Sequence, residues 1–232
     1  MKRSYEKEMM DLPGQPKELL EEDLRNLRVI NRYLGGSRNG VRGLKHVLRK
    51  QGFRQFSLLD VGTGSADIAV ALLAWAKRRG IDARIVGLDA DPVTAGTAAA
   101  LSKRFAEVAI VRADAFAPPF AAKSFDFVFA SQLLHHFSEE RIVMALRNWS
   151  KVARRAIIVS DLVRHPLAYH GIRLLTRAFT RNVMTRTDAP LSVKRAFTVA
   201  EWRELFRSAG VGPFQIFPAF PFRVMALIFP KG

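Results

Sequence analysis

Three aspartates, Asp60, Asp89 and Asp114, stand at or just after the ends of short apolar runs. The runs have the length and composition of buried strands and cover residues 56–59, 83–88 and 107–111. A carboxylate can accept two hydrogen bonds side by side, so each aspartate could hold a ligand that offers neighbouring donors. One aspartate after a strand is usually a turn residue, but three successive strands that end in this way indicate a binding site.

A tight turn of small residues, Gly62-Thr63-Gly64-Ser65-Ala66, separates the first strand from a helical pattern at residues 68–76. Glycines let a backbone approach a ligand closely, and the N-terminus of the next helix presents unpaired N–H groups. This order of strand, turn and helix predicts a nucleotide pocket. A dinucleotide fingerprint would need glycine where Asp67 stands, and a pyrophosphate would repel that carboxylate, which disfavours NAD and FAD. No Gly-Lys-Ser/Thr follows, so the turn is not a P-loop.

The stretch resembles motif I of the class I S-adenosylmethionine-dependent methyltransferases. Asp60, Gly62 and Gly64 match that motif, and Ala66 stands where the family often has a third glycine. The resemblance implies S-adenosylmethionine as the cofactor. It implies that the cofactor-binding residues are Asp60, Gly62, Thr63, Gly64, Asp89, Ala90, Asp114, Ala115, Ser131 and Gln132.

Particular roles follow from the same resemblance. Asp89 would accept hydrogen bonds from both ribose hydroxyls. Asp114 would accept from the adenine amino group, and the Ala115 N–H would donate to a ring nitrogen. Ser131 and Gln132, which follow a fourth strand at residues 125–130, would lie near the sulfonium.

Two histidines, His135 and His136, come shortly after the fourth strand. This segment resembles small-molecule methyltransferases of ubiquinone and menaquinone biosynthesis. Histidine titrates near neutrality and could act as a general base, as could Asp161 after a fifth strand at residues 155–160. The alternative, which we favour for the histidines, is structural capping. Because the chain has no cysteine, a thiolate metal site and a cysteine nucleophile are excluded, and no metal site is expected.

Residues 1–55 are expected to form a helical N-terminal cap, and residues 56–232 the methyltransferase domain. In the cap, leucines at helical spacing predict a helix between Pro16 and Gly35-Gly36, followed by a second at residues 41–50. The cap could simply pack on the sheet edge. It could instead form a lid over the cofactor, with Asn31, Arg32 or Arg38 reaching the methionine carboxylate.

The predicted fold is α/β, with a Rossmann-like, doubly wound sheet of seven strands. It is mostly parallel, with an antiparallel C-terminal hairpin at residues 214–217 and 222–229. Residues 162–197 hold no evident strand, and in this family such an insertion shapes the acceptor pocket. The insertion contains an amphipathic helix at residues 167–179. A capping box of Thr198 and Glu201 begins another helix, which Gly210 ends.

Composition limits the setting in which the protein works. The 232 residues are 49% hydrophobic, which suffices for a core, and contain neither a membrane-spanning run nor a signal peptide. Cytoplasm is therefore the expected compartment. The net charge of +16 favours an anionic partner, which could be nucleic acid, an anionic membrane surface or an acidic substrate.

The acceptor class can be narrowed by what is missing. No Asn/Asp-Pro-Pro-Tyr/Phe segment follows the fourth strand, which disfavours N6-adenine methylation, and without cysteine the covalent route to 5-methylcytosine is excluded. The insertion is rich in aliphatic and aromatic residues. We therefore expect O- or C-methylation of a small, lipophilic acceptor such as a quinone, phenol or polyketide-like product. Two alternatives stay open, an RNA methyltransferase and a non-catalytic binding protein that keeps the fold.

The amphipathic helix of the insertion carries arginines beside its apolar face, at Arg173, Arg177 and, just beyond it, Arg181. Such a helix can lie in the interface of an anionic bilayer, from which a lipophilic acceptor could be collected. The alternative, which we favour slightly, is a solvated basic face over an ordinary buried lid. The sequence does not predict an oligomeric state.

Overall fold

A computed structural model of the chain describes residues 1–49 and 53–231. Within these residues a single mixed sheet has the strand order β3-β2-β1-β4-β5-β7-β6. The strands are β1 (Gln55–Val61), β2 (Asp82–Asp89), β3 (Val108–Arg112), β4 (Phe125–Ser131), β5 (Ala153–Leu162), β6 (Phe214–Ala219) and β7 (Arg223–Ile228). The first five strands are parallel, and β7 is antiparallel to both β5 and β6. The predicted seven-stranded sheet with an antiparallel C-terminal hairpin is confirmed.

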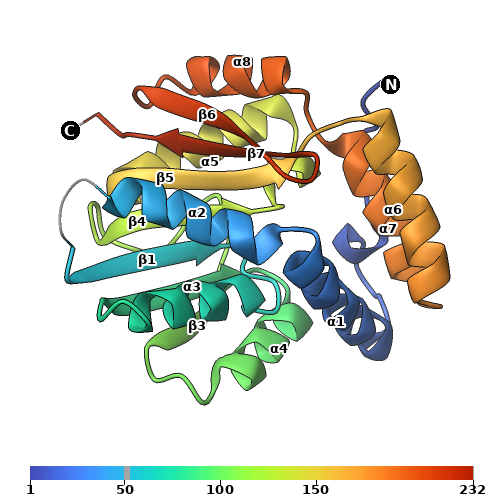
Figure 1. Cartoon of the computed structure of the whole chain (residues 1–232), viewed down its shortest axis with the longest axis horizontal. Coiled ribbons are helices and arrows are strands. Elements are labelled where there is room, and N and C mark those ends of the chain that lie inside the picture. Colours follow the sequence, from blue (N-terminus) through green and yellow to red (C-terminus); the bar gives the residue numbers. More distant parts are fainter. Residues whose placement is uncertain (50–52, 232) are drawn as a thin grey trace.

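Helices cover both faces of the sheet and one of its ends (Figure 1). They are α1 (Lys17–Tyr33), α2 (Gly36–Leu48), α3 (Asp67–Lys77), α4 (Pro92–Ser102), α5 (Glu139–Val152), α6 (Pro166–Phe179), α7 (Val183–Arg195) and α8 (Val199–Ala209), with short 3-10 turns η1 (Met9–Asp11) and η2 (Leu134–His136). One core contains side chains of α2, α3 and α4, and the other contains those of α5 and α8. Helices α1, α6 and α7 gather beyond the carboxyl ends of the parallel strands (Figure 1). None of the described helices combines the length and apolar character of a membrane span.

The position of strand β4 inside the sheet explains why its sequence is continuously apolar instead of alternating between apolar and polar residues. Phe127 and Phe129 pack in the core beneath α2 and α3, while Val128 and Ala130 pack in the core beneath α5. All four side chains are buried, because helices cover the sheet on both sides. The strand thus places Ser131 rigidly at its carboxyl end.

The second helix of the N-terminal region begins earlier than predicted, at Gly36, and its expected last residue Lys50 lies outside the described residues. Gly35-Gly36 were expected to separate the two helices, but Gly36 is already helical, and Gly40 and Gly43 allow the helix to approach the sheet. A Cβ on Gly43 would come within 2.8 Å of Ile158 Cγ2, and one on Gly40 within 3.1 Å of Phe129. Helix propensity was therefore a poor guide, because tertiary contact decides these positions.

The insertion between β5 and α8 contains a helix that the sequence did not reveal. The expected amphipathic helix is α6, but α7 follows it, with Pro190 in its interior. Its buried side includes polar residues, among them Thr185, Asp188 and Arg195, so no apolar stripe marks the buried face. Next along the chain, the predicted capping box of α8 is confirmed.

Candidate cofactor and acceptor site

A cavity of about 930 Å³ lies beyond the carboxyl ends of the parallel strands. Its wall combines the glycine turn, the ends of β1, β2 and β4, and side chains from α1, α6 and α7. In open α/β sheets this is the edge at which ligands bind. A second hollow, of about 1150 Å³, lies between α5 and α8 and contains none of the strand-end aspartates, so we place the chemistry in the first.

The glycine turn forms the floor of the cavity. Gly62, Gly64 and Ala66 adopt positive φ angles of 67°, 57° and 57°, so the chain tolerates an alanine in the left-handed region at the third position. The N–H groups of Gly62 and Thr63 both donate to Leu88 O, at 2.8 and 3.0 Å. A Cβ on Gly64 would meet no atom within 4 Å. The turn is therefore held by its hydrogen bonds to the end of β2 and leaves open space on the side of the cavity.

Asp60 and Asp89 hold this turn from two sides. Asp60 is buried and accepts a hydrogen bond of 2.7 Å from Thr63 Oγ1, and burial raises the pKa of its carboxyl to about 7. Asp89 accepts from the N–H groups of Gly64 and Asp91, each at 3.1 Å. Burial raises the pKa of Asp89 to about 6 despite these bonds. Each Asp89 oxygen keeps a second lone pair, and its carboxylate borders the cavity.

The residues after β2 and β3 complete the same wall. Ala90, Asp114 and Ala115 all border the cavity. Asp114 accepts a hydrogen bond of 2.9 Å from the Phe116 N–H, and the Trp149 indole donates to Ala115 O at 2.7 Å. These bonds fix the loop that follows β3.

Ser131 and Gln132 border the cavity at the end of β4. The Gln132 side chain donates to Asn31 Oδ1 at 2.6 Å, and the Asn31 amide donates to Asp67 Oδ2 at 3.2 Å. Asn31 therefore attaches α1 to both the end of β4 and the start of α3. Of the three residues expected to reach into the cavity from the cap, Asn31 lies in its wall.

The expectation for Arg32 and Arg38 is wrong. Both side chains are exposed and lie outside the cavity wall, because they fall on the solvent side of their helices. A residue that the sequence did not single out provides a cation instead. Arg223, at the start of β7, is 4% exposed and borders the cavity. Its Nε donates to Leu34 O at 3.1 Å, and its Nη1 has no hydrogen-bond partner among the described residues.

His135 and Asp161 form a buried pair. The His135 Nδ1 lies 2.6 Å from Asp161 Oδ1, and Asp161 also accepts from the N–H groups of Leu134 and Leu162. Burial by itself would raise the pKa of Asp161, but the adjacent His135 and these hydrogen bonds hold it below its ordinary value. Asp161 is therefore occupied in positioning His135 and is absent from the cavity wall.

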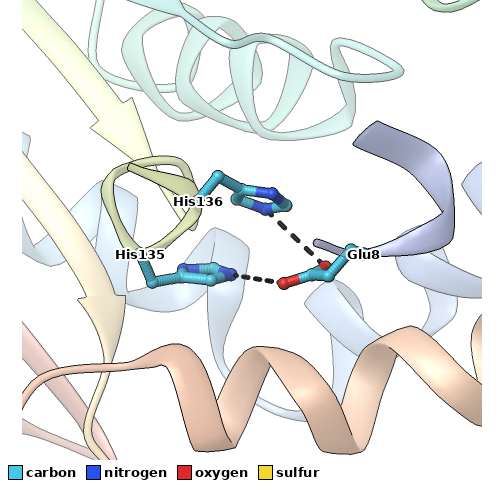
Figure 2. A group of neighbouring side chains, drawn as sticks. All are labelled: Glu8, His135 and His136. Carbon is cyan, nitrogen blue, oxygen red and sulfur yellow. Dashed lines mark ion pairs between the residues drawn. The ribbon is translucent and has the colours of Figure 1, made fainter. Parts of the chain in front are cut away.

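The N-terminal segment brings two unforeseen carboxylates to the histidines. Glu8 lies beside the two neighbouring rings and faces both, with one oxygen 3.7 Å from His135 Nε2 and the other 3.8 Å from His136 Nε2 (Figure 2). Asp11 lies 2.9 Å from His136 Nδ1. Burial would lower the pKa of His136, but the charges of Glu8 and Asp11 outweigh it and raise the pKa to about 9.

Arg3 anchors this segment. Its guanidinium donates to Arg195 O, Phe137 O and Glu139 at 2.7–2.9 Å. It also stacks 3.8 Å over the ring of Phe197. These contacts could not be predicted from local patterns, because residues 1–14 carry no apolar periodicity.

The geometry agrees with comparisons to known proteins. A family model described as a methyltransferase domain matches residues 58–156. The demethylmenaquinone methyltransferase of Roseiflexus sp. (strain RS-1) is 31% identical over 166 residues, a match that covers 66% of this chain and 66% of that relative. The chain belongs to the class I S-adenosylmethionine-dependent methyltransferases.

Solved structures share the fold of this methyltransferase at low sequence identity. An S-adenosylmethionine-dependent methyltransferase from Aquifex aeolicus has a TM-score of 0.60 at 16% identity, covering 81% of this chain and 89% of that one. An O-methyltransferase family 2 protein from Planctomyces limnophilus, solved in complex with apigenin, has a TM-score of 0.65 at 14% identity. That match covers 94% of this chain and 63% of the Planctomyces chain.

S-adenosylmethionine is the cofactor of the methyltransferase, and it supplies a methyl group carried on a positively charged sulfur. The cavity fits a molecule of this kind. Its volume lies in the range of ligand pockets, the floor above Gly64 is open, and the Asp89 carboxylate keeps acceptor capacity for hydroxyl groups. Carboxylates in the wall also suit a cationic ligand.

Proposed function

We propose that this methyltransferase methylates a small, lipophilic acceptor, a quinone, phenol or polyketide-like compound, at oxygen or carbon, and that it works in the cytoplasm. The observation that carries the proposal is the composition of the cavity. The wall beyond the glycine turn is largely aliphatic and is formed by Leu24, Leu27, Ile30, Leu34, Leu167, Ile172 and Leu175. The curated relative is named for a quinone acceptor, and the Planctomyces protein binds apigenin, which supports this class of acceptor.

The residues to which we assign cofactor binding lie at the ends of the strands. Asp89 accepts hydrogen bonds from the ribose hydroxyls, and Asp114 with the Ala115 N–H binds the adenine. Ser131 and Gln132 line the wall near the sulfonium. The methionine carboxylate lies near Asn31 and the Nη1 of Arg223, because that guanidinium is buried in the wall and has hydrogen-bonding capacity left among the described residues.

Acceptor activation belongs to the histidine cluster. Methyl transfer from sulfur leaves a neutral thioether, so alignment supplies much of the rate, about 7–11 kcal/mol for well-oriented reactants. A phenol with a pKa near ~10 must also lose its proton. We assign this proton transfer to the cluster of Glu8, His135 and His136, which borders the cavity, and treat Asp161 as the residue that positions His135.

Turnover measurements on single variants test this function. The purified protein, given S-adenosylmethionine and a panel of quinols and phenols, should form a methylated product. We expect His135→Ala to lower kcat about 100-fold or more, the range for general acid–base catalysis, while the calorimetric affinity for the cofactor stays the same. The matched control is His170→Gln, an exposed histidine of α6. Normal turnover in His135→Ala, His136→Ala and Glu8→Ala would contradict the role given to the cluster.

We also propose that α6 rests on an anionic membrane. Its side chains Leu167 and Leu174 are 66% and 73% exposed, and Thr176 is the one buried residue of this helix. Helical spacing places these leucines between the cavity-lining Leu175 and the exposed Arg173. An apolar stripe with a basic edge suits a bilayer interface, and the cavity beside it would receive an acceptor dissolved in the lipid.

A further inference from the structure

The ring nitrogens of the two histidines converge on Glu8 (Figure 2). His135 Nε2, His136 Nε2 and a carboxylate oxygen of Glu8 all lie within 4.8 Å of one another. Donors around a tetrahedral zinc ion lie roughly 3.4 Å apart, since each is about 2.0–2.1 Å from the metal. His135 Nε2 lies 3.7 Å from Glu8 Oε1, and His136 Nε2 lies 3.8 Å from the other oxygen, Oε2, so each nitrogen is close to that spacing from one oxygen of the carboxylate. Small side-chain adjustments would bring the three donors to coordination distance.

A carboxylate fixes the far side of each ring. Asp161 Oδ1 lies 2.6 Å from His135 Nδ1, and Asp11 Oδ2 lies 2.9 Å from His136 Nδ1. Histidine ligands of metals usually donate their other N–H to such a partner, which sets the tautomer and directs the Nε2 lone pair at the ion. When a ring is neutral and donates its Nδ1–H in this way, its Nε2 lone pair is directed at Glu8, where an ion would compete with the second proton that His136 otherwise carries. A cation between the two groups would attract both.

Two of the donor atoms have no hydrogen-bond partner in the described part of the chain, whereas Glu8 Oε2 accepts from Ser192 Oγ at 2.9 Å. Glu8 Oε1 and His135 Nε2 are buried and make no hydrogen bond within the described part of the chain. Arg195 Nε is 3.6 Å from Glu8 Oε1, but this guanidinium donates to the carbonyls of Glu6, His135 and His136. Arg195 therefore fixes the peptides that carry the ligands and leaves the Glu8 oxygen unsatisfied. A buried polar atom without a hydrogen-bond partner is destabilising, and a bound ion would relieve that cost.

We propose that Glu8, His135 and His136 bind a divalent transition-metal ion. Two imidazole nitrogens and one carboxylate oxygen suit zinc, and also iron or cobalt in the divalent state. All three residues border the cavity, so further coordination positions would face the acceptor. No metal site was expected from a sequence without cysteine. This one was missed because Glu8 reaches the histidines only through the fold. An ion held there would take over the activation of the acceptor from these three side chains, because a bound metal lowers the pKa of an oxygen coordinated to it. The binding itself does not depend on the proposed acceptor.

Metal binding to the full chain tests the proposal directly. The purified protein is stripped with a chelator and titrated with Zn²⁺ by calorimetry and with Co²⁺ by visible absorption. We expect one ion per chain and a visible cobalt spectrum typical of nitrogen and oxygen ligands. Glu8→Gln and His135→Gln should each weaken binding 100-fold or more, and Asp11→Asn 10–100-fold, as for other residues that hold metal ligands. The matched control is Glu6→Gln, an exposed residue of the same segment, with unchanged binding.

Cofactor affinity, measured on every variant, reports whether the fold is intact. Wild-type protein that binds neither ion saturably, or Glu8→Gln protein that binds both as tightly as wild type, overturns the proposal. Methylation by a protein that binds neither ion would overturn the metal site and leave the proposed function standing. Stoichiometric metal in a protein that methylates none of the acceptors would support the site and count against the proposed function.

Discussion

At the scale of residues, Asp89 joins the glycine turn to the wall that follows β2. Its oxygens accept from Gly64 and Asp91, and its remaining lone pairs border the cavity. We predict that Asp89→Ala weakens S-adenosylmethionine binding by about 1.5–3 kcal/mol, the range for hydrogen bonds to a charged group. Because burial raises the pKa of Asp89 to about 6, wild-type affinity should also fall as the pH drops below 6. Calorimetry measures both effects.

The control for this variant is Asp82→Ala, an exposed aspartate at the opposite end of the same strand. The affinity of Asp82→Ala for S-adenosylmethionine should equal that of the wild type. Unchanged affinity in Asp89→Ala would refute the ribose assignment for this residue.

The buried Asp23 of α1 should make the free energy of unfolding depend on pH. Burial raises its pKa from 3.8 to about 7, although Thr185 donates to it at 2.6 Å. A carboxyl with a raised folded-state pKa contributes stability below pH ~4, and that contribution is lost as the pH rises through 7. Asp23→Asn should therefore increase the free energy of unfolding at pH 8 by roughly 1–3 kcal/mol, with little change near pH 4.

Urea denaturation at the two pH values measures this difference. Asp82→Asn, at an exposed site without a buried partner, should change neither value. If Asp23→Asn raised the free energy of unfolding more at pH 4 than at pH 8, the pH dependence would have the opposite sign and the explanation would be refuted.

At the scale of elements, α2 is distinguished by its close approach to the sheet. Replacing helical glycine by alanine normally stabilises a protein by up to about 1 kcal/mol. In α2, a Cβ on Gly43 would lie 2.8 Å from Ile158 Cγ2 and 3.0 Å from Met225 Sδ. We predict that Gly43→Ala instead destabilises by about 1–3 kcal/mol, the cost of overpacking a core.

Thermal and urea unfolding check the sign. Gly96→Ala is the matched control, because Gly96 lies inside α4 and a Cβ there would meet no atom within 4 Å. This control should gain stability. Equal behaviour of the two variants would show that α2 can move away from the sheet without cost.

The elements also show where sequence reasoning succeeds. The strands of the sheet could be predicted because buried parallel strands leave continuous apolar runs that end in Asp60, Asp89 and Asp161. Helix α7 could not, because polar residues interrupt its buried side, and one of them, Thr185, is satisfied by Asp23 on another helix. Glu8 could not be found either, since its partners at η2 lie more than a hundred residues away. Asp11 and His136, which meet in the same cluster, are 125 residues apart. Local patterns carry no information on such contacts.

At the scale of the whole molecule, positive charge gathers in the C-terminal half. The arginines and lysines between residues 154 and 207 are Arg154, Arg155, Arg164, Arg173, Arg177, Arg181, Arg186, Lys194, Arg195, Arg203 and Arg207, against four acidic residues, Asp161, Asp188, Glu201 and Glu204. Each exposed basic residue near an anionic bilayer contributes about 1 kcal/mol. We predict that the protein sediments with anionic vesicles and not with neutral ones. Glutamine at Arg173, Arg177 and Arg181 should abolish this binding.

A control with the same change of charge replaces Arg78, Arg79 and Arg84, exposed residues at the other end of the sheet, and should still bind. Equal recovery in the supernatant with both vesicle types would refute membrane docking. Binding to RNA with a steep salt dependence would then identify nucleic acid as the anionic partner.

The position of Arg3 has a practical consequence for anyone who produces this enzyme. Arg3 anchors the N-terminal segment that carries Glu8, and Glu8 borders the cavity. Arg164 also donates to the carbonyl of Met1 at 3.1 Å. An affinity tag fused in front of Met1 would therefore begin next to this contact and could compete with the contacts that hold Glu8 in place. A tag after Lys231 would start beyond β7, far from the carboxyl ends of the parallel strands (Figure 1). Preparations that differ only in tag position could thus differ in activity, and proteolytic trimming of a few leading residues could inactivate a protein that still folds and still binds its cofactor.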